Sequence, residues 1–340
     1  MALGTRGRPL DLDRDRTVLL FFEDVEQDTF FRNDRHVRRA LRKLYHTVKV
    51  GQTRSGFGTA FALLRRALER VGYRVVVNDH RLARRNPDYP VGVAGYPHIL
   101  REWTLPNPAV LGPGLLDHPA LAPTLMEDPR FRSYLVPCEW MKALFSPVYG
   151  SRVAIWYAGI DLDEWPDYAT HPKDVDFLVY DKIRWNRQAR DDGVLRPMMA
   201  ALERRGLRVE VLRYGHYSVP DYRALLARSR GMLFLSEHET QGIAYQEAMS
   251  CNVPILAWVN GHWTDPQVSG LSSEPVAATS VPLFSPECGE RFTDAEDGGP
   301  ALDRFLARRE TYCPRRYVAE NLSLERTGRM YLEHYLSVGR

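Results

Sequence analysis

The segment from Gly231 to Trp258 (GMLFLSEHETQGIAYQEAMSCNVPILAW) constrains the fold of this chain more than any other. It holds an apolar run at Met232 to Ser236, a polar loop with a glycine, a helical pattern from Ile243 to Cys251, and a second apolar run after Pro254. A strand, a loop, a helix and a strand in this order build a parallel sheet with helices on its faces. Ligands of such sheets bind beyond the carboxyl ends of the strands, where this loop and helix start are expected.

The same segment resembles the donor-binding signature of retaining glycosyltransferases with the GT-B fold, in particular glycosyltransferase family 4. That signature has two glutamates with seven residues between them, and it is matched here by Glu239, Gly242, Glu247, Ala248, Met249 and Pro254. Thr240 and Asn252 stand where the family has glycines. The resemblance implies two Rossmann-like, doubly wound parallel-sheet α/β domains that face each other across a cleft. It also implies transfer of a sugar from a nucleotide-diphosphate donor to the hydroxyl of a glycan, a glycolipid or a small molecule.

The chemistry of such a donor explains the residue types in this segment. Carboxylates accept charge-assisted hydrogen bonds from vicinal hydroxyls, and a helix N-terminus offers unpaired N–H groups to phosphate. By the resemblance, Glu247 holds the ribose and Glu239 holds the donor sugar. Gly242 and Ile243 offer backbone N–H groups, while Thr240 and Gln241 complete the loop and narrow the choice of sugar. The plain alternative is that both glutamates are solvated surface acids of an ordinary helix.

A basic turn follows the predicted strand at Asp176 to Asp181. Members of the family carry an arginine and a lysine here that clamp the donor diphosphate. Lys182 and Arg187 keep that spacing with the two residue types exchanged, and Arg184 lies between them. Arginine provides a bidentate fork and lysine a mobile point charge, so either suits a diphosphate. A solvated basic turn is the alternative. Farther along, Tyr214 opens the loop where the family places the nucleobase.

The first domain has a second candidate anion site. A short strand at Val48 to Gly51 leads into a loop with Gly56, Gly58 and Thr59, and a helix is predicted from Ala60 to Val71. Glycosyltransferases of this fold often have such a loop facing the diphosphate across the cleft, although a simple tight turn explains the glycines equally well. Gly56 and Gly58 also permit another function, an NAD(P)-dependent oxidoreductase with Asp79 near the distance expected for a ribose-binding acid. A third possibility is a non-catalytic protein that binds sugar nucleotides on the same fold.

A retaining transferase of this type needs no protein nucleophile, because the departing phosphate itself can serve as base, and the sequence shows no Ser/His/Asp arrangement. An active-site histidine is common in the first domain of the family. His118, in a loop after a predicted strand, is the preferred candidate for a catalytic residue, and His98 is the second. Both are equally compatible with structural or surface positions.

Composition sets the remaining limits. The 340 residues suffice for two domains, with 44% hydrophobic and 26% charged residues. A net charge of +3 is too small to indicate nucleic acid as a partner. The four cysteines show no metal-ligand spacing, and neither a signal-peptide core nor an apolar run of membrane-spanning length is present. We therefore expect a cytoplasmic, bacterial protein with no cofactor and no obligatory metal, in which the Asp161/Asp163 and Asp174/Asp176 pairs are linker acids.

The predicted organisation is an extended or disordered N-terminus (1–16), an N-terminal acceptor domain (17–160), a linker (161–174), a C-terminal donor domain (175–316) and a helix that returns to the first domain (317–340). A basic amphipathic helix is predicted within 30–45. It either contacts a membrane surface or an acceptor phosphate at the inner face of the membrane, or it is a solvated helix packed on its own domain.

Overall fold

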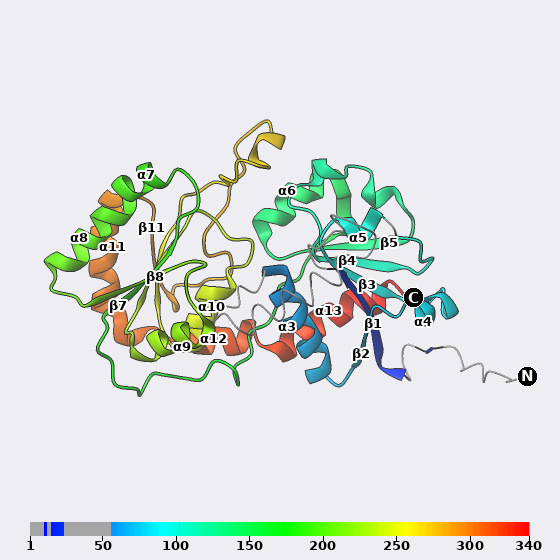
Figure 1. The fold of residues 1–340 in the computed structure, drawn as a ribbon, viewed down its shortest axis with the longest axis horizontal. Helices are drawn as coiled ribbons and strands as arrows, with labels where there is room; N and C mark the ends of the chain where they lie inside the picture. The colour runs from blue at the N-terminus through cyan, green and yellow to red at the C-terminus, as the bar shows by residue number, and fades with distance from the viewer. Residues whose placement is uncertain (1–9, 12–14, 24–55, 102, 340) are drawn as a thin grey trace, which may run out of the picture.

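Two α/β domains lie side by side in the computed structural model, which describes residues 10–11, 15–23, 56–101 and 103–339 (Figure 1). The predicted basic helix within 30–45 and the predicted strand at 48–51 lie outside the described residues. Within the described residues, no helix combines the length and the apolar character that crossing a membrane requires.

The N-terminal domain is built on a six-stranded sheet with the order β2-β1-β3-β4-β5-β6, in which every pairing is parallel. The strands are β1 (Thr17–Glu23), β2 (Arg74–Val77), β3 (Val91–Gly95), β4 (Ala109–Gly114), β5 (Phe131–Val136) and β6 (Val153–Ile155). Its helices are α3 (Gly56–Arg70), α4 (His80–Arg85), α5 (His98–Arg101) and α6 (Glu139–Tyr149), with short 3₁₀ turns at Pro119–Leu121, Leu125–Glu127 and Gly150–Arg152. The central strands are buried along most of their length, which explains their continuous apolar runs.

The second domain has a five-stranded parallel sheet with the order β11-β10-β9-β7-β8. Its strands are β7 (Phe177–Lys182), β8 (Val209–Arg213), β9 (Met232–Ser236), β10 (Ile255–Trp258) and β11 (Gly289–Phe292). Its helices are α7 (Arg187–Arg190), a π-helical turn (Asp191–Leu195), α8 (Arg196–Arg204), α9 (Val219–Arg228), α10 (Ile243–Ser250), α11 (Ala295–Arg308) and α12 (Pro314–Asn321), with 3₁₀ turns at Ser269–Leu271 and Arg309–Thr311.

Alternate residues of β7 enter two separate cores. Leu178 and Tyr180 belong to the apolar cluster on one face of the second sheet, and Phe177 and Val179 belong to the cluster on the other face. This period of two is the geometry of a strand covered by helices on both sides. Both sheets are parallel and covered by helices, so the predicted class of two doubly wound α/β domains is confirmed.

The chain passes between the domains twice, and the two passages lie together. Ile160 N–H donates to Leu322 O at 2.7 Å, and Ile160 and Ser323 form a parallel β-bridge. After the second passage α13 (Leu324–Ser337) lies against α3 of the N-terminal domain (Figure 1). Leu324 and Tyr331 are part of the N-terminal core.

The C-terminal segment predicted as one helix (317–340) is not one continuous helix. The chain forms two helices, α12 and α13, with Leu322 and Ser323 between them. Ser323 has an extended backbone and precedes α13 as its cap residue, so the helix is interrupted where the chain changes domain. Tyr317 packs against the core of the second domain.

Candidate functional site

A cavity of about 330 Å³ lies between the two domains at the carboxyl ends of their strands. The N-terminal domain contributes the first turn of α3, the end of β4 and the residue after β5, namely Gly56, Phe57, Thr59, Ala60, Pro113, Gly114 and Pro137. The second domain and the connecting segment contribute Glu164, Trp165, Tyr180, Lys182, Tyr214, Gly215, Tyr217, Val219, the run 239–244 and Glu247. The site predicted from the 231–258 segment therefore opens into a cleft between domains.

Glu239 is the most buried carboxylate of this cavity, at 8% exposure. Its Oε1 accepts a hydrogen bond from Ser236 Oγ at 2.9 Å and lies 2.6 Å from Lys182 Nζ. Its backbone N–H donates to Thr279 O at 2.9 Å. A buried carboxylate with a fixed backbone and a cationic partner is preorganised to accept hydrogen bonds from a polar ligand.

Lys182 ends β7 and stands between Glu239 and an aromatic ring. Its Nζ lies 4.7 Å from the centre of the Tyr214 ring, which is 46% exposed at the cavity wall. The Lys182 side chain is 16% exposed, so its charge is poorly screened by water. The position suits a negative group that enters the cavity.

The N-terminus of α10 also faces the cavity. Its cap residue Gly242 has φ 79° and ψ 49°, in the left-handed region, and no side chain caps the helix. A Cβ on Gly242 would lie 2.2 Å from the Tyr245 ring, so only glycine fits. Ile243 and Ala244 follow on the cavity wall and direct the first N–H groups of the helix toward it. Anions are stabilised at such a helix end.

Glu247 lies on the α10 face that borders the cavity, and it also borders a smaller pocket with Arg66 and Glu164. The structure therefore brings both glutamates of the motif to one ligand-sized space. Thr240 is exposed at the wall of that space.

Gln241 lines the cavity, but its amide group binds protein. Its Oε1 accepts from Ala158 N–H at 2.9 Å and its Nε2 donates to Ala158 O at 2.7 Å. This residue ties the loop before α10 to the segment that leaves the N-terminal domain.

An aromatic wall lines the cavity and consists of Trp165, Tyr180, Tyr214 and Tyr217. The Tyr180 and Tyr217 hydroxyls are 2.6 Å apart, and Trp165 packs edge-on against Tyr222 at 5.7 Å. Burial first, then the negative charge of the neighbouring carboxylates, raises the pKa of Tyr217 to about 12 despite its bond to Tyr180. Tyr180, Trp165 and Glu164 were missed in the sequence because they sit in a strand and a linker with no motif around them. For Tyr180 the available signal was its place at the end of an apolar strand, directly before the charged residues Asp181 and Lys182.

The first turn of α3 differs from the loop predicted for Gly56, Gly58 and Thr59. All three lie within the helix, which is described from Gly56 onward. Glycine is tolerated in a first turn, where its N–H would have no helical partner. Gly56 and Thr59 border the cavity, whereas Gly58 is not among its lining residues. The predicted Asp79 ribose contact is instead a helix cap, because its Oδ1 accepts from Leu82 N–H at 2.9 Å.

Arg187 and Arg184 lie outside the cavity walls. The Arg187 guanidinium is paired with Asp181 and Asp191, with N–O distances of 2.7 Å to each. To reach a diphosphate it would have to leave both carboxylates. Arg184 is exposed and stacks on the Trp185 ring at 4.5 Å.

His118 contacts the second domain rather than the cavity. Its Nε2 lies 2.9 Å from Ser272 Oγ, its Nδ1 accepts from Ala120 N–H at 3.0 Å, and its ring stacks on Trp263. Burial lowers the pKa of His118. His98 also lies away from the cavity walls, 3.4 Å from Glu23. Neither histidine is placed where the prediction of a catalytic histidine requires it.

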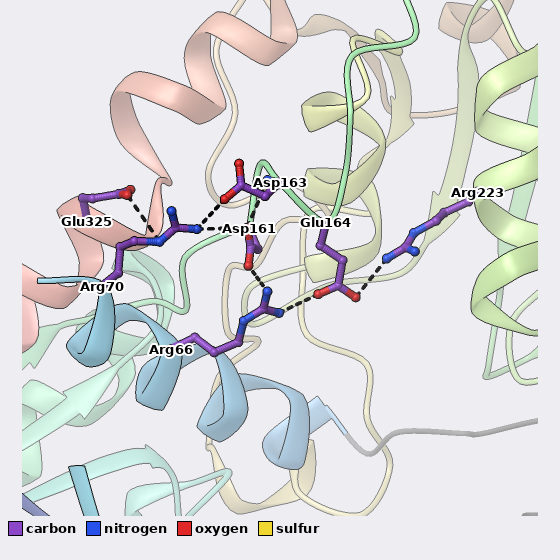
Figure 2. A network of polar contacts seen from close by, with 7 residues as sticks. All are labelled: Arg66, Arg70, Asp161, Asp163, Glu164, Arg223 and Glu325. Atoms are coloured by element: carbon purple, nitrogen blue, oxygen red, sulfur yellow. Dashed lines mark hydrogen bonds and ion pairs between the residues drawn. The ribbon is translucent and has the colours of Figure 1, made fainter. Parts of the chain in front are cut away.

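Beside the cavity a set of ion pairs joins both domains to the connecting segment. Figure 2 shows Arg66 and Arg70 of α3 directed toward Asp161, Asp163 and Glu164, with Glu325 of α13 and Arg223 of α9 at its two ends. Glu164 accepts from Arg66 Nη1 at 2.5 Å and from Arg223 Nη2 at 2.9 Å. Asp161 is 2% exposed and is bonded to Arg66. Of the four acids expected to be simple linker residues, Asp161 and Asp163 therefore belong to an interdomain network, whereas Asp174 and Asp176 pair with arginines of the second domain.

Comparison with known proteins identifies the fold. A scan against protein-family models gives no match, and a search of curated proteins gives none either. Solved structures do match over nearly the whole chain. A glycosyltransferase from Rickettsia africae is 10% identical with a TM-score of 0.60, covering 96% of this chain and 99% of its own.

Two further structures agree. The catalytic domain of starch synthase IV from Arabidopsis thaliana, bound to ADP and acarbose, is 9% identical with a TM-score of 0.56, and sucrose-phosphate synthase from Thermosynechococcus elongatus is 12% identical with a TM-score of 0.53. Each match covers 95% of this chain and 99% of the other. The chain therefore has the GT-B fold, as expected from its sequence.

Proposed function

We propose that this protein is a retaining glycosyltransferase that moves a sugar from a nucleotide-diphosphate donor to an acceptor hydroxyl. The observation that carries the proposal is the group of Glu239, Lys182 and the α10 N-terminus at one interdomain cavity. The GT-B fold supports it, since the structures that share this fold with the chain include sugar transferases.

In the proposed reaction, the donor diphosphate lies between Lys182 and the N–H groups of Gly242 and Ile243. Its glycosidic C–O bond breaks, and the electron pair leaves with the diphosphate. The acceptor oxygen bonds to the anomeric carbon on the same face, and its proton passes to a departing phosphate oxygen. A fixed cation and a helix end stabilise the growing negative charge without reorganising.

The two carboxylates select the donor in this proposal. Glu239 accepts hydrogen bonds from the donor sugar and Glu247 from the ribose, since each carboxylate can accept from vicinal hydroxyls. The aromatic wall at Tyr214 and Tyr217 offers ring faces to a nucleobase. The starch synthase domain of the same fold is bound to ADP and acarbose, and a nucleotide with a sugar is the ligand class proposed here.

An NAD(P)-dependent oxidoreductase is not favoured. A dinucleotide motif needs its glycines in the turn between a strand and a helix. Here Gly56 and Gly58 lie inside α3, and Asp79 caps α4.

Thermal-shift measurements with UDP-, ADP-, GDP- and dTDP-sugars and with NAD(P) test the binding step. We expect stabilisation by a nucleotide sugar. Stabilisation by a dinucleotide alone would refute the proposal. The proposed reaction needs no metal, so transfer should persist in a chelator.

The catalytic step is tested with Glu239→Gln, which keeps the shape and removes the charge. We expect transfer to fall by about 10²- to 10³-fold, the usual effect of removing one preorganised group. Glu290→Gln is the matched control, because Glu290 is also mostly buried and paired with a cation, Arg308, but lies away from the cavity. Equal activity of Glu239→Gln and wild type, or an inverted anomeric centre in the product by NMR, would contradict the assignment.

A further inference from the structure

One residue of the N-terminal domain binds directly to the backbone of Glu239. Trp140, on α6, donates from Nε1 to Glu239 O at 2.9 Å, although the two are 99 positions apart. Since Glu239 N–H binds Thr279 O, both backbone groups of this residue are held from outside its own loop. Of these two backbone hydrogen bonds, the one from Trp140 comes from the N-terminal domain.

The Trp140 ring is itself held by the second domain. It packs against Trp263 at 5.7 Å and edge-on against His238 at 6.3 Å and 84°. Trp263 belongs to a small apolar cluster of the β10–β11 connection, against which Trp140 and Leu144 of α6 pack. This connection also contacts His118, through Trp263 and Ser272. The indole N–H is therefore aimed at Glu239 O only while the connection and α6 are packed together.

We propose that Trp140 is a positioning residue, through which docking of the acceptor domain fixes the Glu239 carboxylate for the donor sugar. This inference rests on the proposed glycosyl transfer. The carboxylate is bonded at one end to Lys182 and Ser236, and its backbone is bonded at the other end to Trp140. Separation of the domains removes the indole bond, so the Glu239 carbonyl loses this partner while its N–H stays bonded to Thr279 O. The sugar is thus held in the reacting orientation only when the acceptor domain is in place.

The selectivity of this effect follows from the geometry. Trp140 binds Glu239 O, whereas Lys182 is placed by β7 and the loop before α10 is tied to Ala158 by Gln241, so neither of these groups depends on the indole bond. Loss of the indole bond should therefore affect the sugar and leave the binding of the nucleoside diphosphate unchanged.

The test is Trp140→Phe, which keeps an aromatic ring and removes the N–H donor. We expect kcat for transfer to fall about threefold to tenfold, the usual effect of losing one net hydrogen bond. The Kd for the nucleoside diphosphate alone, measured by calorimetry, should stay within twofold of wild type. In the Glu239→Gln background the same substitution should change the residual rate by less than about twofold, because Trp140 acts through Glu239.

Trp156→Phe is the matched control. Its Nε1 also donates to a backbone carbonyl, Thr327 O at 2.9 Å, but within the N-terminal core. It should lower the Tm and leave kcat unchanged. Wild-type kcat in Trp140→Phe, or a parallel loss of nucleoside diphosphate binding, would overturn the inference. If the wild-type protein transfers no sugar at all, the proposed function fails instead.

Discussion

His238 stands between Glu237 and Glu239 in the loop after β9, and its ring is enclosed by aromatic residues. It stacks on Trp185 with ring centres 5.1 Å apart and meets Trp140 and Trp263 edge-on. Its Nδ1 is buried without a hydrogen-bond partner among the described residues. The neutral form of this ring is favoured, because a proton on Nδ1 would have no hydrogen-bond acceptor among the described residues.

The pH dependence of stability should reflect this residue. Burial, then the charges of Arg184 and Lys182 and the neighbouring His262, lower the pKa of His238 to about 4. Between the ordinary histidine value of about 6.5 and this value, the unfolded chain binds a proton that the folded chain does not. The contribution of His238 to the free energy of unfolding is thus complete above a pH of about 6.5. It decreases as the pH falls toward about 4, by up to about 1.4 kcal/mol per pH unit.

Replacing this histidine should flatten the acid side of the stability profile. We expect His238→Gln to reduce the loss of unfolding free energy between roughly pH 6.5 and 4.5, measured by urea denaturation, relative to wild type. His216→Gln, in an exposed loop of the same domain, is the control. The raised pKa of the Glu237 carboxyl, caused by burial, acts with the opposite sign and is common to all three proteins. An unchanged slope in His238→Gln would contradict this account.

At the scale of elements, the most extensive contact between two helices among the described residues joins α13 to α3. A Cβ on Gly328 of α13 would lie 2.5 Å from Ala67 O of α3. The two backbones touch there because glycine has no side chain. This contact anchors the last helix of the chain to the first domain.

Two helical glycines should therefore respond to alanine in opposite directions. We expect Gly328→Ala to lower the free energy of unfolding by about 1 to 3 kcal/mol, because the new Cβ would force the backbones of α3 and α13 apart. Gly193→Ala, in the π-helical turn before α8 with open space around its Cβ, should raise it by up to about 1 kcal/mol through helix propensity. Denaturant unfolding of both variants measures the difference. Equal effects of the two substitutions would argue against close packing of α13.

At the scale of the whole molecule, two sets of contacts join the domains at the cavity. Trp140 binds the backbone of Glu239, and the ion-pair network of Figure 2 joins the domains through Glu164, another residue of the cavity wall. In that network Glu164 binds Arg66 of the first domain and Arg223 of the second. Arg223 also lies 4.7 Å from the ring of Trp165, a cavity residue.

The ion pairs of this network should make the affinity for a nucleotide sugar depend on salt concentration. We expect Arg223→Gln to weaken nucleotide-sugar binding roughly twofold to fivefold at low ionic strength, the range for partly exposed pairs. The difference from wild type should shrink in about 0.5 M salt, where charges are screened within a few ångströms. Isothermal titration at both salt concentrations measures it. Arg228→Gln is the control, since Arg228 lies on the same helix and pairs with Asp174 of the connecting segment. A loss of affinity in both variants would exclude a specific interdomain effect.

Local patterns in the sequence determined the fold class and the order of most elements. The strand at Met232 to Ser236, the loop with Gly242 and the helix with Glu247 follow from short-range periodicity and a required left-handed cap. The position of Lys182 can be predicted in the same way, because this charged residue ends an apolar strand. These features depend on neighbours in the chain, so they can be recognised without knowing the rest of the structure.

Only the tertiary structure decided which residues act across the cleft. Trp140 meets Glu239 over 99 positions and His118 meets Ser272 over 154, and no local pattern encodes either contact. The break between α12 and α13 arises because the chain changes domain there, although the helical pattern continues. The physical reason is the same in each case. Backbone conformation depends on adjacent residues, whereas the packing of two domains depends on surfaces assembled from distant parts of the chain.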